Sequence, residues 1–394
     1  MTKPSLNQST ENADLSTLTP AMRQFIEIRT EVAKQHPNIL LLYRMGDFYE
    51  TFFEDAVEIN RLLGITLTSR GKGKPDAIPM AGVPFMTLDS YLARLVKLGK
   101  SVGIVEQIGD PAAVKGTMPR KLVRIVTPGT ITEDELLPAK ADAALIAVCP
   151  PSGKKSPQWS VVSLVLSSGA FKGFCCTEDE LPGEIARISP QEILIPDSCR
   201  ETAKSFSGAA QLTPLPDWHF DPKHGTDELL HHFNMENLDA WAVSEKPGVL
   251  AAAGAILGYV EQTQVDAVPH IRPLVFEESS RFVGLDPSSR RNLELTEPLR
   301  SENGPTLFST IDHCHTSMGS RMLRSWITQP LRDPTVPRAR HEAVREMIEN
   351  ESLRDALSEP LKNLPDLERV ASRIALGSVR PRELSGLRDA LPAL

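Results

Sequence analysis

The sequence has few cysteines, and they are not arranged for a disulfide framework or a zinc site. Its 394 residues include five, an odd number, and no Cys-x-x-Cys pair occurs among them. They are Cys149, Cys175, Cys176, Cys199 and Cys314. Cysteine usage of this kind favours a reducing compartment, so we expect a cytoplasmic protein.

Long apolar segments are also missing. The longest, Val249 to Val260, is too short to cross a bilayer and predicts a buried helix instead. The first 20 residues are polar, rich in Ser, Thr and Asn, and without the apolar core of a signal peptide. We therefore expect no membrane association and no export, and residues 1–20 are expected to form a disordered tail.

The sequence contains no nucleotide-binding loop and no metal motif. No Gly-x-x-x-x-Gly-Lys-Ser/Thr pattern occurs, and Gly153-Lys154-Lys155-Ser156 has neither that spacing nor an apolar strand before it. His313 and His315, with Cys314 between them, lack a fourth ligand at zinc spacing. We expect no cofactor in this chain.

The formal net charge is −8, but one segment is basic. Between Arg70 and Arg124 there are ten basic and four acidic residues, a net charge of +6. Such a segment is typical of a phosphate-binding face, although an ordinary solvated surface explains the charge equally well. The candidate phosphate contacts are Arg70, Lys72, Lys74, Arg94 and Lys97.

The length and the apolar spacing predict several domains in three successive regions, two of mixed α/β type and one all-α. The first is predicted to hold strands at 39–43, 65–69, 102–106 and 122–126 and helices at 21–34, 47–63 and 88–98. The second is predicted to hold a hairpin at 161–175, a helix at 178–188, a strand at 192–195 and helical sequence at 224–262. After a linker at 266–273 no strand is expected, and helices are predicted at 289–295, 306–313, 317–326, 336–357, 361–376 and 382–391.

The stretch 43–50, Tyr-Arg-Met-Gly-Asp-Phe-Tyr-Glu, predicts the start of a helix. Asp47 is a favourable N-cap, and Glu50 would complete a capping box. An exposed aromatic such as Phe48 in a first turn can act as a wedge that inserts into a binding partner. The carboxylate of Glu50 beside it can recognise that partner by hydrogen bonding. Helical phase favours Phe48 as a core residue and capping explains Glu50, so the residues alone leave both interpretations open.

Seven stretches along the chain form a further pattern. They are Met45 to Glu50, Ile78 to Pro84, Glu106 to Pro111, Arg124 to Thr130, Arg290 to Leu295, Met318 to Leu323 and Gln329 to Asp333. In content and order they resemble the MutS family of DNA mismatch-repair proteins. The resemblance implies a mixed α/β mismatch-recognition domain at 21–132, an RNase-H-like α/β connector domain at 140–268, and a truncated helical core domain at 280–394.

The resemblance also implies roles for individual residues. Phe48 would stack on a mispaired base from the minor groove, and Glu50 would hydrogen-bond to the same base. A mispaired step resists unstacking and kinking least, so an apolar wedge suits this task. Phosphates around Glu50 would raise its pKa in the complex. Met80 could lie beside the wedge, although a core position explains it as well.

Partners follow from the same resemblance. The family binds double-stranded DNA with mispairs or small loops, pairs with a second copy of itself, and engages a MutL-type repair partner in the bacterial cytoplasm, at the nucleoid. Its ATP and Mg²⁺ belong to a P-loop ATPase domain that lies beyond the matching stretches. We therefore expect this chain not to be an enzyme and not to form that dimer by itself.

Two other functions remain open from the sequence. One is a truncated protein-interaction scaffold that no longer reads DNA. The other is a metal-dependent nuclease, since RNase-H-like folds can hold two metal ions on clustered carboxylates. The opening hairpin strand at 161–166, Val-Val-Ser-Leu-Val-Leu, carries no carboxylate and so disfavours the nuclease.

Overall fold

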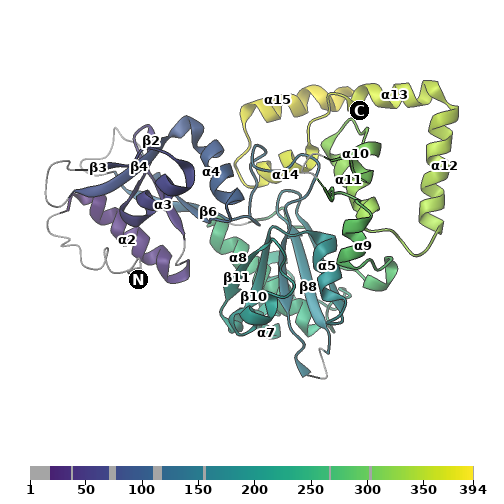
Figure 1. The fold of residues 1–394 in the computed structure, drawn as a ribbon, viewed down its shortest axis with the longest axis horizontal. Helices are drawn as coiled ribbons and strands as arrows, with labels where there is room; N and C mark the ends of the chain where they lie inside the picture. Colours follow the sequence, from purple (N-terminus) through teal and green to yellow (C-terminus); the bar gives the residue numbers. More distant parts are fainter. Residues whose placement is uncertain are drawn as a thin grey trace. The chain divides into compact units, whose positions relative to one another are not determined.

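The computed structural model describes residues 18–36, 39–70, 77–109, 118–153, 157–265, 268–300 and 304–393. The chain divides into two compact units, 1–128 with 261–266, and 129–260 with 267–394. Each unit contains a six-stranded mixed sheet, and the second also contains a run of helices (Figure 1). The predicted tail at 1–20 lies almost wholly outside the described residues.

The first sheet has the order β3-β4-β2-β1-β5-β6, and only β1 and β5 pair in parallel. Its strands are β1 (Leu40–Met45), β2 (Phe48–Phe52), β3 (Thr68–Arg70), β4 (Ile78–Pro84), β5 (Val102–Gln107) and β6 (Arg120–Val126). Of these, β4 was not predicted from the sequence, and β2 was predicted as part of a helix. It pairs along the whole of β2 and so places β2 in the interior of the sheet.

Within the described part of this unit, three α-helices pack on the sheet: α2 (Pro20–Gln35), α3 (Phe53–Leu63) and α4 (Leu88–Lys97), with a 3-10 turn, η1 (Phe85–Thr87), before α4. Phe25 of α2 packs edge-on against Tyr43 and Phe52, with ring centres 5.5 and 5.0 Å away. The buried side chains Ile59 of α3 and Leu92 of α4 lie outside that cluster. Helix α2 therefore covers one face of the sheet, and α3 and α4 cover the other.

The predicted helix start at Asp47 is wrong. Gly46 and Asp47 form a two-residue turn between β1 and β2, with Met45 paired to Phe48. Gly46 has a φ of +61°, the left-handed conformation that a type II′ hairpin turn requires at its first central position. The helix begins only at Phe53. Pairing with strands on both sides overrides the local capping pattern, and aromatic residues suit a strand.

The second sheet has the order β11-β10-β7-β8-β9-β12. Its strands are β7 (Leu145–Cys149), β8 (Trp159–Val165), β9 (Ala170–Cys176), β10 (Glu192–Pro196), β11 (Gln211–Leu215) and β12 (Val275–Phe276). The predicted hairpin is confirmed as β8 and β9. Strands β7 and β11 were not predicted, and β12 contradicts the expectation that no strand follows residue 273, because it pairs with β9.

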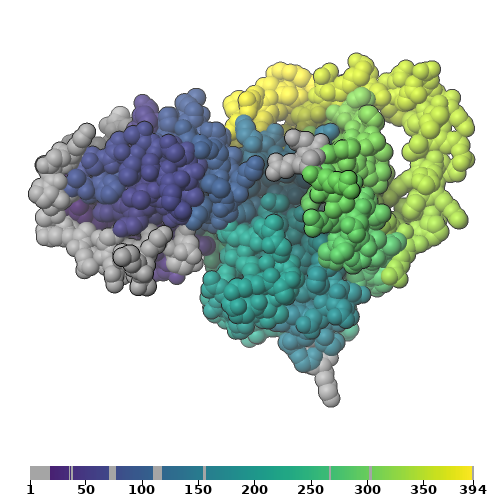
Figure 2. Space-filling model, viewed as in Figure 1, coloured from purple at the N-terminus to yellow at the C-terminus, as the bar shows by residue number. Residues whose placement is uncertain are grey.

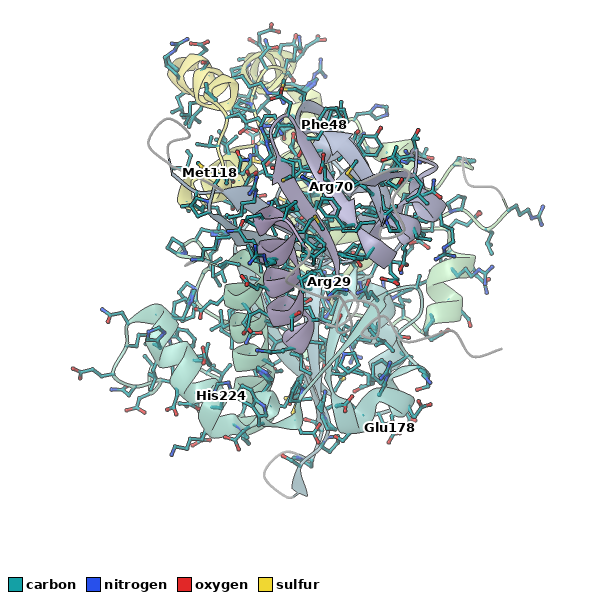
Figure 3. All side chains as sticks on the ribbon, turned by 90° about the vertical axis from the view of Figure 1, so that its left-hand side faces the viewer. Arg29, Phe48, Arg70, Met118, Glu178 and His224 are labelled. Carbon is teal, nitrogen blue, oxygen red and sulfur yellow. The ribbon has the colours of Figure 1, made fainter. Side chains whose placement is uncertain are left out.

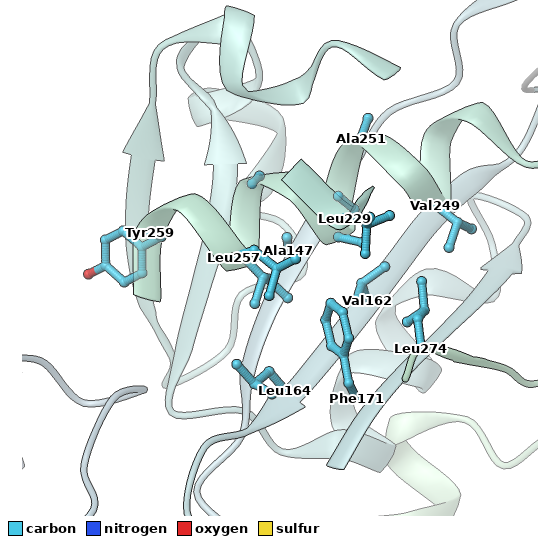
Figure 4. Close-up of a cluster of buried hydrophobic side chains, with 14 of the residues drawn as sticks. Ala147, Val162, Leu164, Phe171, Leu229, Val249, Ala251, Leu257, Tyr259 and Leu274 are labelled. Carbon is cyan, nitrogen blue, oxygen red and sulfur yellow. The ribbon is translucent and has the colours of Figure 1, made fainter. Parts of the chain in front are cut away.

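Helices cover both faces of the second sheet. They are α5 (Leu181–Ile188), α6 (Arg200–Ala203), α7 (Pro222–Phe233) and α8 (Pro247–Gln264). The predicted buried helix is α8, and its Val249 and Leu257 meet Val162, Leu164 and Phe171 of the sheet (Figure 4). On the other face, Leu181 and Ile185 of α5 pack against a separate cluster of strand residues. The α/β class predicted for this region is confirmed.

The last region is helical, as predicted. It contains α9 (Pro287–Asn292), α10 (Leu307–Ile311), α11 (Ser317–Thr328), α12 (Thr335–Glu349), α13 (Glu351–Leu361), α14 (Leu367–Ala375) and α15 (Pro381–Ala390). The single helix predicted at 336–357 is instead two helices, because Asn350 ends α12 and caps α13 by accepting from the Leu353 N–H at 3.1 Å. Figure 2 shows open space between α12 and α11. Among the described residues, no helix is both long and apolar enough to span a membrane.

Two buried arginines hold the segment before β7 against these helices. Arg369 of α14 is 2% exposed and donates from Nη2 to the carbonyl oxygens of Pro138 at 2.8 Å and Ala141 at 3.2 Å. Arg321 of α11 donates to the carbonyl oxygen of Ala139 at 3.3 Å. The segment is thus attached to the helical region before the chain enters the second sheet.

Candidate nucleic-acid interface

Phe48 is an exposed aromatic at the end of a hairpin. It is the first residue of β2, directly after the Gly46-Asp47 turn, and its side chain is 48% exposed. Because side chains alternate along a strand, Phe48, Glu50 and Phe52 share one face of the sheet. Phe52 is buried against α2, whereas Phe48 lies beyond that cluster. The core position that helical phase favoured for Phe48 is therefore wrong (Phe48 is labelled in Figure 3).

Glu50 lies beside Phe48 in a shallow hollow of about 390 Å³. The hollow is lined by Met45, Gly46, Glu50, Arg70, Met80 and Arg120. Glu50 is in a strand, so the capping role predicted for it is wrong. Its Oε2 is buried and accepts no hydrogen bond from the described residues. Burial raises the pKa of Glu50, although Arg70 and Arg120 act in the opposite direction.

Arg120 is a residue of this hollow that the sequence did not single out. Its guanidinium donates from Nε to the Arg44 carbonyl oxygen at 2.7 Å and from Nη1 to the Met118 carbonyl oxygen at 3.0 Å. It also lies 4.9 Å from the centre of the Tyr43 ring. In the sequence, Arg120 was marked only as one member of the basic segment. Its position beside β1 depends on the pairing of β6 with β5 and of β5 with β1.

Arg70 and Met80 are the other predicted residues that reach the hollow. Arg70 Nη1 is 3.9 Å from Glu50 Oε2, and Arg70 ends β3 opposite Ile78 (Arg70 is labelled in Figure 3). Met80 pairs with Phe52 across β2 and β4 and packs in part against the α2 cluster. Met80 therefore lies next to Glu50 and also contributes to the core.

The remaining predicted contacts are not gathered here. Arg94 and Lys97 lie on α4, on the opposite face of the sheet from Glu50, and Arg94 donates to the carbonyl oxygen of Leu63 at 2.7 Å. Lys72 and Lys74 lie outside the described residues. The basic segment is thus divided between two faces, and its charge in sequence overstates its charge near Glu50.

The opposite face of β2 holds the hairpin in place. Tyr49 is buried, and its hydroxyl donates to the Glu106 carboxylate of β5. Burial and then the hydrogen bond to Glu106 raise the pKa of Tyr49 far above its ordinary range. Arg44 lies over the Phe85 ring, 3.7 Å from its centre. These contacts hold β2 through the face that carries Tyr49. Phe48 and Glu50 lie on the other face of the strand and take no part in them.

Within the part of the chain that the structure describes, no group of three or more His, Cys, Asp or Glu side chains could hold a metal ion. The hollow offers a carboxyl group with an unused oxygen and two guanidinium groups, and Phe48, on the same face of β2, provides an exposed aromatic surface. These groups suit stacking, hydrogen bonding and contact with an anion.

The fold and the hollow together define a modular α/β and helical protein whose first domain presents an aromatic and a carboxyl group from one strand. Comparison with protein families gives a match to MutS domain I over residues 19–135, to MutS domain II over 143–272, and to MutS domain III over 288–394. The chain belongs to the MutS family, which confirms the resemblance seen in the sequence. Membership supports a role in DNA mismatch repair and implies binding of mismatched DNA.

Proposed function

We propose that this chain recognises a mispaired base with Phe48 as the wedge and Glu50 as the hydrogen-bonding partner. The observation that carries the proposal is the placement of both side chains on one face of β2. Phe48 is 48% exposed, and Glu50 has a buried oxygen without a donor. A groove-inserted aromatic ring and a carboxyl group two residues away could then meet the same base.

The energetics favour binding at a mispaired step, whatever the base sequence around it. Stacking of a base on an aromatic side chain stabilises a complex by roughly 1 to 3 kcal/mol, whichever base it is. Inserting a wedge costs a few kcal/mol of unstacking, and a mispaired step already stacks and pairs poorly. Discrimination would come from the ease with which the DNA deforms, so several kinds of mispair and small loops would be accepted.

Arg70 and Arg120 would contribute charge at the edge of the site. Guanidinium groups contact phosphate in a bidentate manner and position a duplex without reading its sequence. Lys72 and Lys74 remain proposed backbone contacts because they follow Arg70 in the chain. Arg94 and Lys97 are not included, since α4 covers the other face of the sheet.

We also propose that this recognition requires neither nucleotide nor metal ion, and that it takes place in the cytoplasm. A MutL-type protein is the proposed protein partner, on the basis of family membership alone, whereas the second copy that the family binds is not proposed for this chain by itself. Heteroduplex binding that is unchanged by EDTA and by added ATP is the expected result for recognition by these side chains.

The test is a titration of fluorescently labelled G·T heteroduplex and the matched homoduplex. Wild-type protein is expected to prefer the heteroduplex, and Phe48→Ala is expected to weaken heteroduplex binding by roughly 5- to 150-fold, which corresponds to one stacked base. Trp218→Ala is the control, since Trp218 is an exposed aromatic of the second unit, at 58%.

The same titration separates the alternatives. Absence of any heteroduplex preference in the wild type would favour the protein-interaction scaffold. Cleavage of the labelled strand when Mg²⁺ is added would favour the nuclease. Retention of the full preference in Phe48→Ala would contradict the wedge.

A further inference from the structure

A second cavity lies wholly in the second unit, between the sheet and the helical region. Its volume is about 830 Å³, and its walls come from β8, β9, α5, α9, α11 and residues 138–144. Helix α9 contacts α5 here, and both are visible beside β8 in Figure 1. The cavity is large enough for a small ligand of several functional groups.

The walls of this cavity carry more cations than anions. Six basic side chains line it: Lys172, Arg187, Arg290, Arg291, Arg321 and Arg324. Three acidic side chains do so: Asp142, Glu277 and Glu297. The excess of positive charge lies in a partly enclosed space, where low polarisability strengthens attraction to an anion.

Three of these cations are already neutralised by carboxylates. Lys172 pairs with Glu277 at 2.8 Å, and Arg187 pairs with Glu184 at 2.7 Å. Arg321 has several acidic partners, including Asp366 with Nη2 to Oδ1 at 2.9 Å. These three residues therefore contribute structure rather than an open binding group.

The other three are not neutralised in this way. Among the described residues, Arg290 donates only to backbone carbonyl oxygens, from Nη1 to Thr328 at 2.8 Å and from Nε to Leu285 at 3.2 Å. Arg324 is half-buried, lies over the Phe308 ring 5.5 Å from its centre, and makes no hydrogen bond or ion pair through its guanidinium with the described residues. Arg291 is exposed and has no such partner among the described residues either.

Arg290 and Arg324 are half-buried guanidinium groups that form no ion pair with a carboxylate among the described residues, which is costly for the protein. Burial and then the charge of Arg187 lower the pKa of Arg290, and burial lowers the pKa of Arg324, although the charge of Glu184 acts in the opposite direction on Arg290 and the charges of Glu297 and Asp142 do so on Arg324. An anion in the cavity would relieve both effects at once. A guanidinium has five N–H donors, and Arg290 uses only two of its nitrogens, so donors remain for a planar or tetrahedral oxyanion.

We propose that this cavity binds a small phosphate-bearing anion, held by Arg290 and Arg324 with Arg291 at the entrance. Phosphate oxygens accept several hydrogen bonds in the fork geometry that arginine presents. Ser325 and Gln329 line the same wall and supply neutral donors. The site is separate from the hollow at Glu50 and does not depend on the function proposed for Phe48 and Glu50.

The test uses the full chain and sodium pyrophosphate as the probe, measured by isothermal titration calorimetry at constant ionic strength. Saturable binding at one site is expected, and sodium chloride at equal ionic strength should give none. Arg324→Gln is expected to weaken binding about tenfold or more, as for the loss of a charge-assisted hydrogen bond. Arg340→Gln is the matched control, because Arg340 also lies over an aromatic ring, 3.8 Å from the centre of Trp326.

Further arms identify the source of the phosphate. ADP that competes with pyrophosphate would support a nucleotide-sized ligand, and inorganic phosphate that competes alone would support a smaller one. Binding of a single-stranded oligonucleotide that depends on Arg324, with no binding of pyrophosphate, would overturn the small-anion proposal. Equal weakening by Arg324→Gln and Arg340→Gln would overturn it too. Far-ultraviolet circular dichroism checks that both variants fold, and Phe48→Ala is expected to bind pyrophosphate like the wild type.

Discussion

Arg70 Nη1 lies 3.9 Å from Glu50 Oε2, near enough for electrostatic attraction but too far for a hydrogen bond. The carboxyl group is thus influenced by a cation without being saturated by it. Burial outweighs this attraction and raises the pKa of Glu50 from its ordinary value of 4.5. The group therefore holds its proton to a higher pH than a free glutamate does, which is useful only if a neutral carboxyl group has something to donate to.

The first prediction concerns the pH dependence of DNA binding. Phosphates of a bound duplex would raise the pKa of Glu50 further, so binding takes up a proton and heteroduplex affinity should fall as pH rises from 5 to 8. Glu50→Gln keeps a neutral donor and should show little of this dependence. Fluorescence anisotropy across the pH range measures both. Arg70→Gln should move the wild-type transition to higher pH, because Arg70 lowers the pKa of Glu50. Parallel pH curves for wild type and Glu50→Gln would refute a titrating Glu50.

The second prediction concerns stability in the first unit. Asp55 of α3 is 4% exposed, lies 3.3 Å from Arg29 Nε, and accepts from the Leu41 N–H at 3.1 Å. Burial nonetheless raises its pKa from 3.8 to about 6. An acid with a raised pKa binds more protons in the folded state than in the unfolded state between these values. Stability should therefore fall as pH rises from about 4 to about 6, relative to Asp55→Asn, and stay level above that range.

Native-state hydrogen exchange of the Leu41 amide measures this effect, since that amide donates to Asp55. Glu58→Gln is the control on the same helix. It removes a more exposed ion pair, with Lys100 at 2.6 Å, and should change stability by less than about 1 kcal/mol. A stability difference between wild type and Asp55→Asn that does not vary between pH 4 and 6 would contradict the prediction.

The third prediction concerns the hairpin turn. Gly46 has a φ of +61°, and a Cβ placed on it would meet no atom within 4 Å. Gly46→Ala should thus cost about 1 kcal/mol through backbone strain alone, without a clash. Exchange of the Phe85 amide reports the turn, because it donates to the Asp47 carbonyl oxygen at 2.8 Å. Gly284→Ala is the control, with the same open space and no positive φ. Equal effects of the two substitutions on their own neighbourhoods would show that the turn is unstrained.

The fourth prediction concerns the segment that Arg369 holds. Arg369→Met removes the donor to the carbonyl oxygens of Pro138 and Ala141, and the loss of each hydrogen bond from a charged donor costs about 1.5 to 3 kcal/mol. Trypsin should then cleave after Lys140 at least about tenfold faster than in the wild type. Arg345→Met, at an exposed pair with Glu342, should leave the rate unchanged. The assay is electrophoresis of timed digests, and an unchanged rate in Arg369→Met would refute the anchoring role.

Apolar spacing predicted the elements that bury a continuous surface. Helix α8 is an example, because its apolar run is too long for a strand and too short for a membrane. The bounds of helix α4 and strand β5 were also predicted within a residue or two, since the spacing of their apolar residues fits only one type of secondary structure in each case. Strand β11 was missed because three of its five residues are polar or proline, so it lacks the apolar pattern that predicts a strand.

The candidate site shows a different limit. The residues at Asp47 do match a helix-capping pattern. However, Gly46-Asp47 between two aromatic-rich stretches also predicts a two-residue hairpin turn, and the structure contains the hairpin. Arg120 could not have been placed beside Glu50 from the sequence, because 70 residues separate them and only the order of the strands joins them. Burial of Glu50 likewise depends on β4, which the sequence did not reveal.

The attachment of Pro138 to Arg369 has a consequence for biosynthesis. The two residues are 231 positions apart, so a ribosome must add all the intervening residues before the Pro138 carbonyl oxygen can meet its donor. At the usual bacterial and eukaryotic pace of about 5 to 20 residues per second, that takes roughly 10 to 50 seconds. The first domain can complete its own sheet during this interval, while the Pro138 carbonyl oxygen still lacks its donor. Synthesis from the N-terminus would thus let the domains fold in order, and the hydrogen bond between Pro138 and Arg369 would form last.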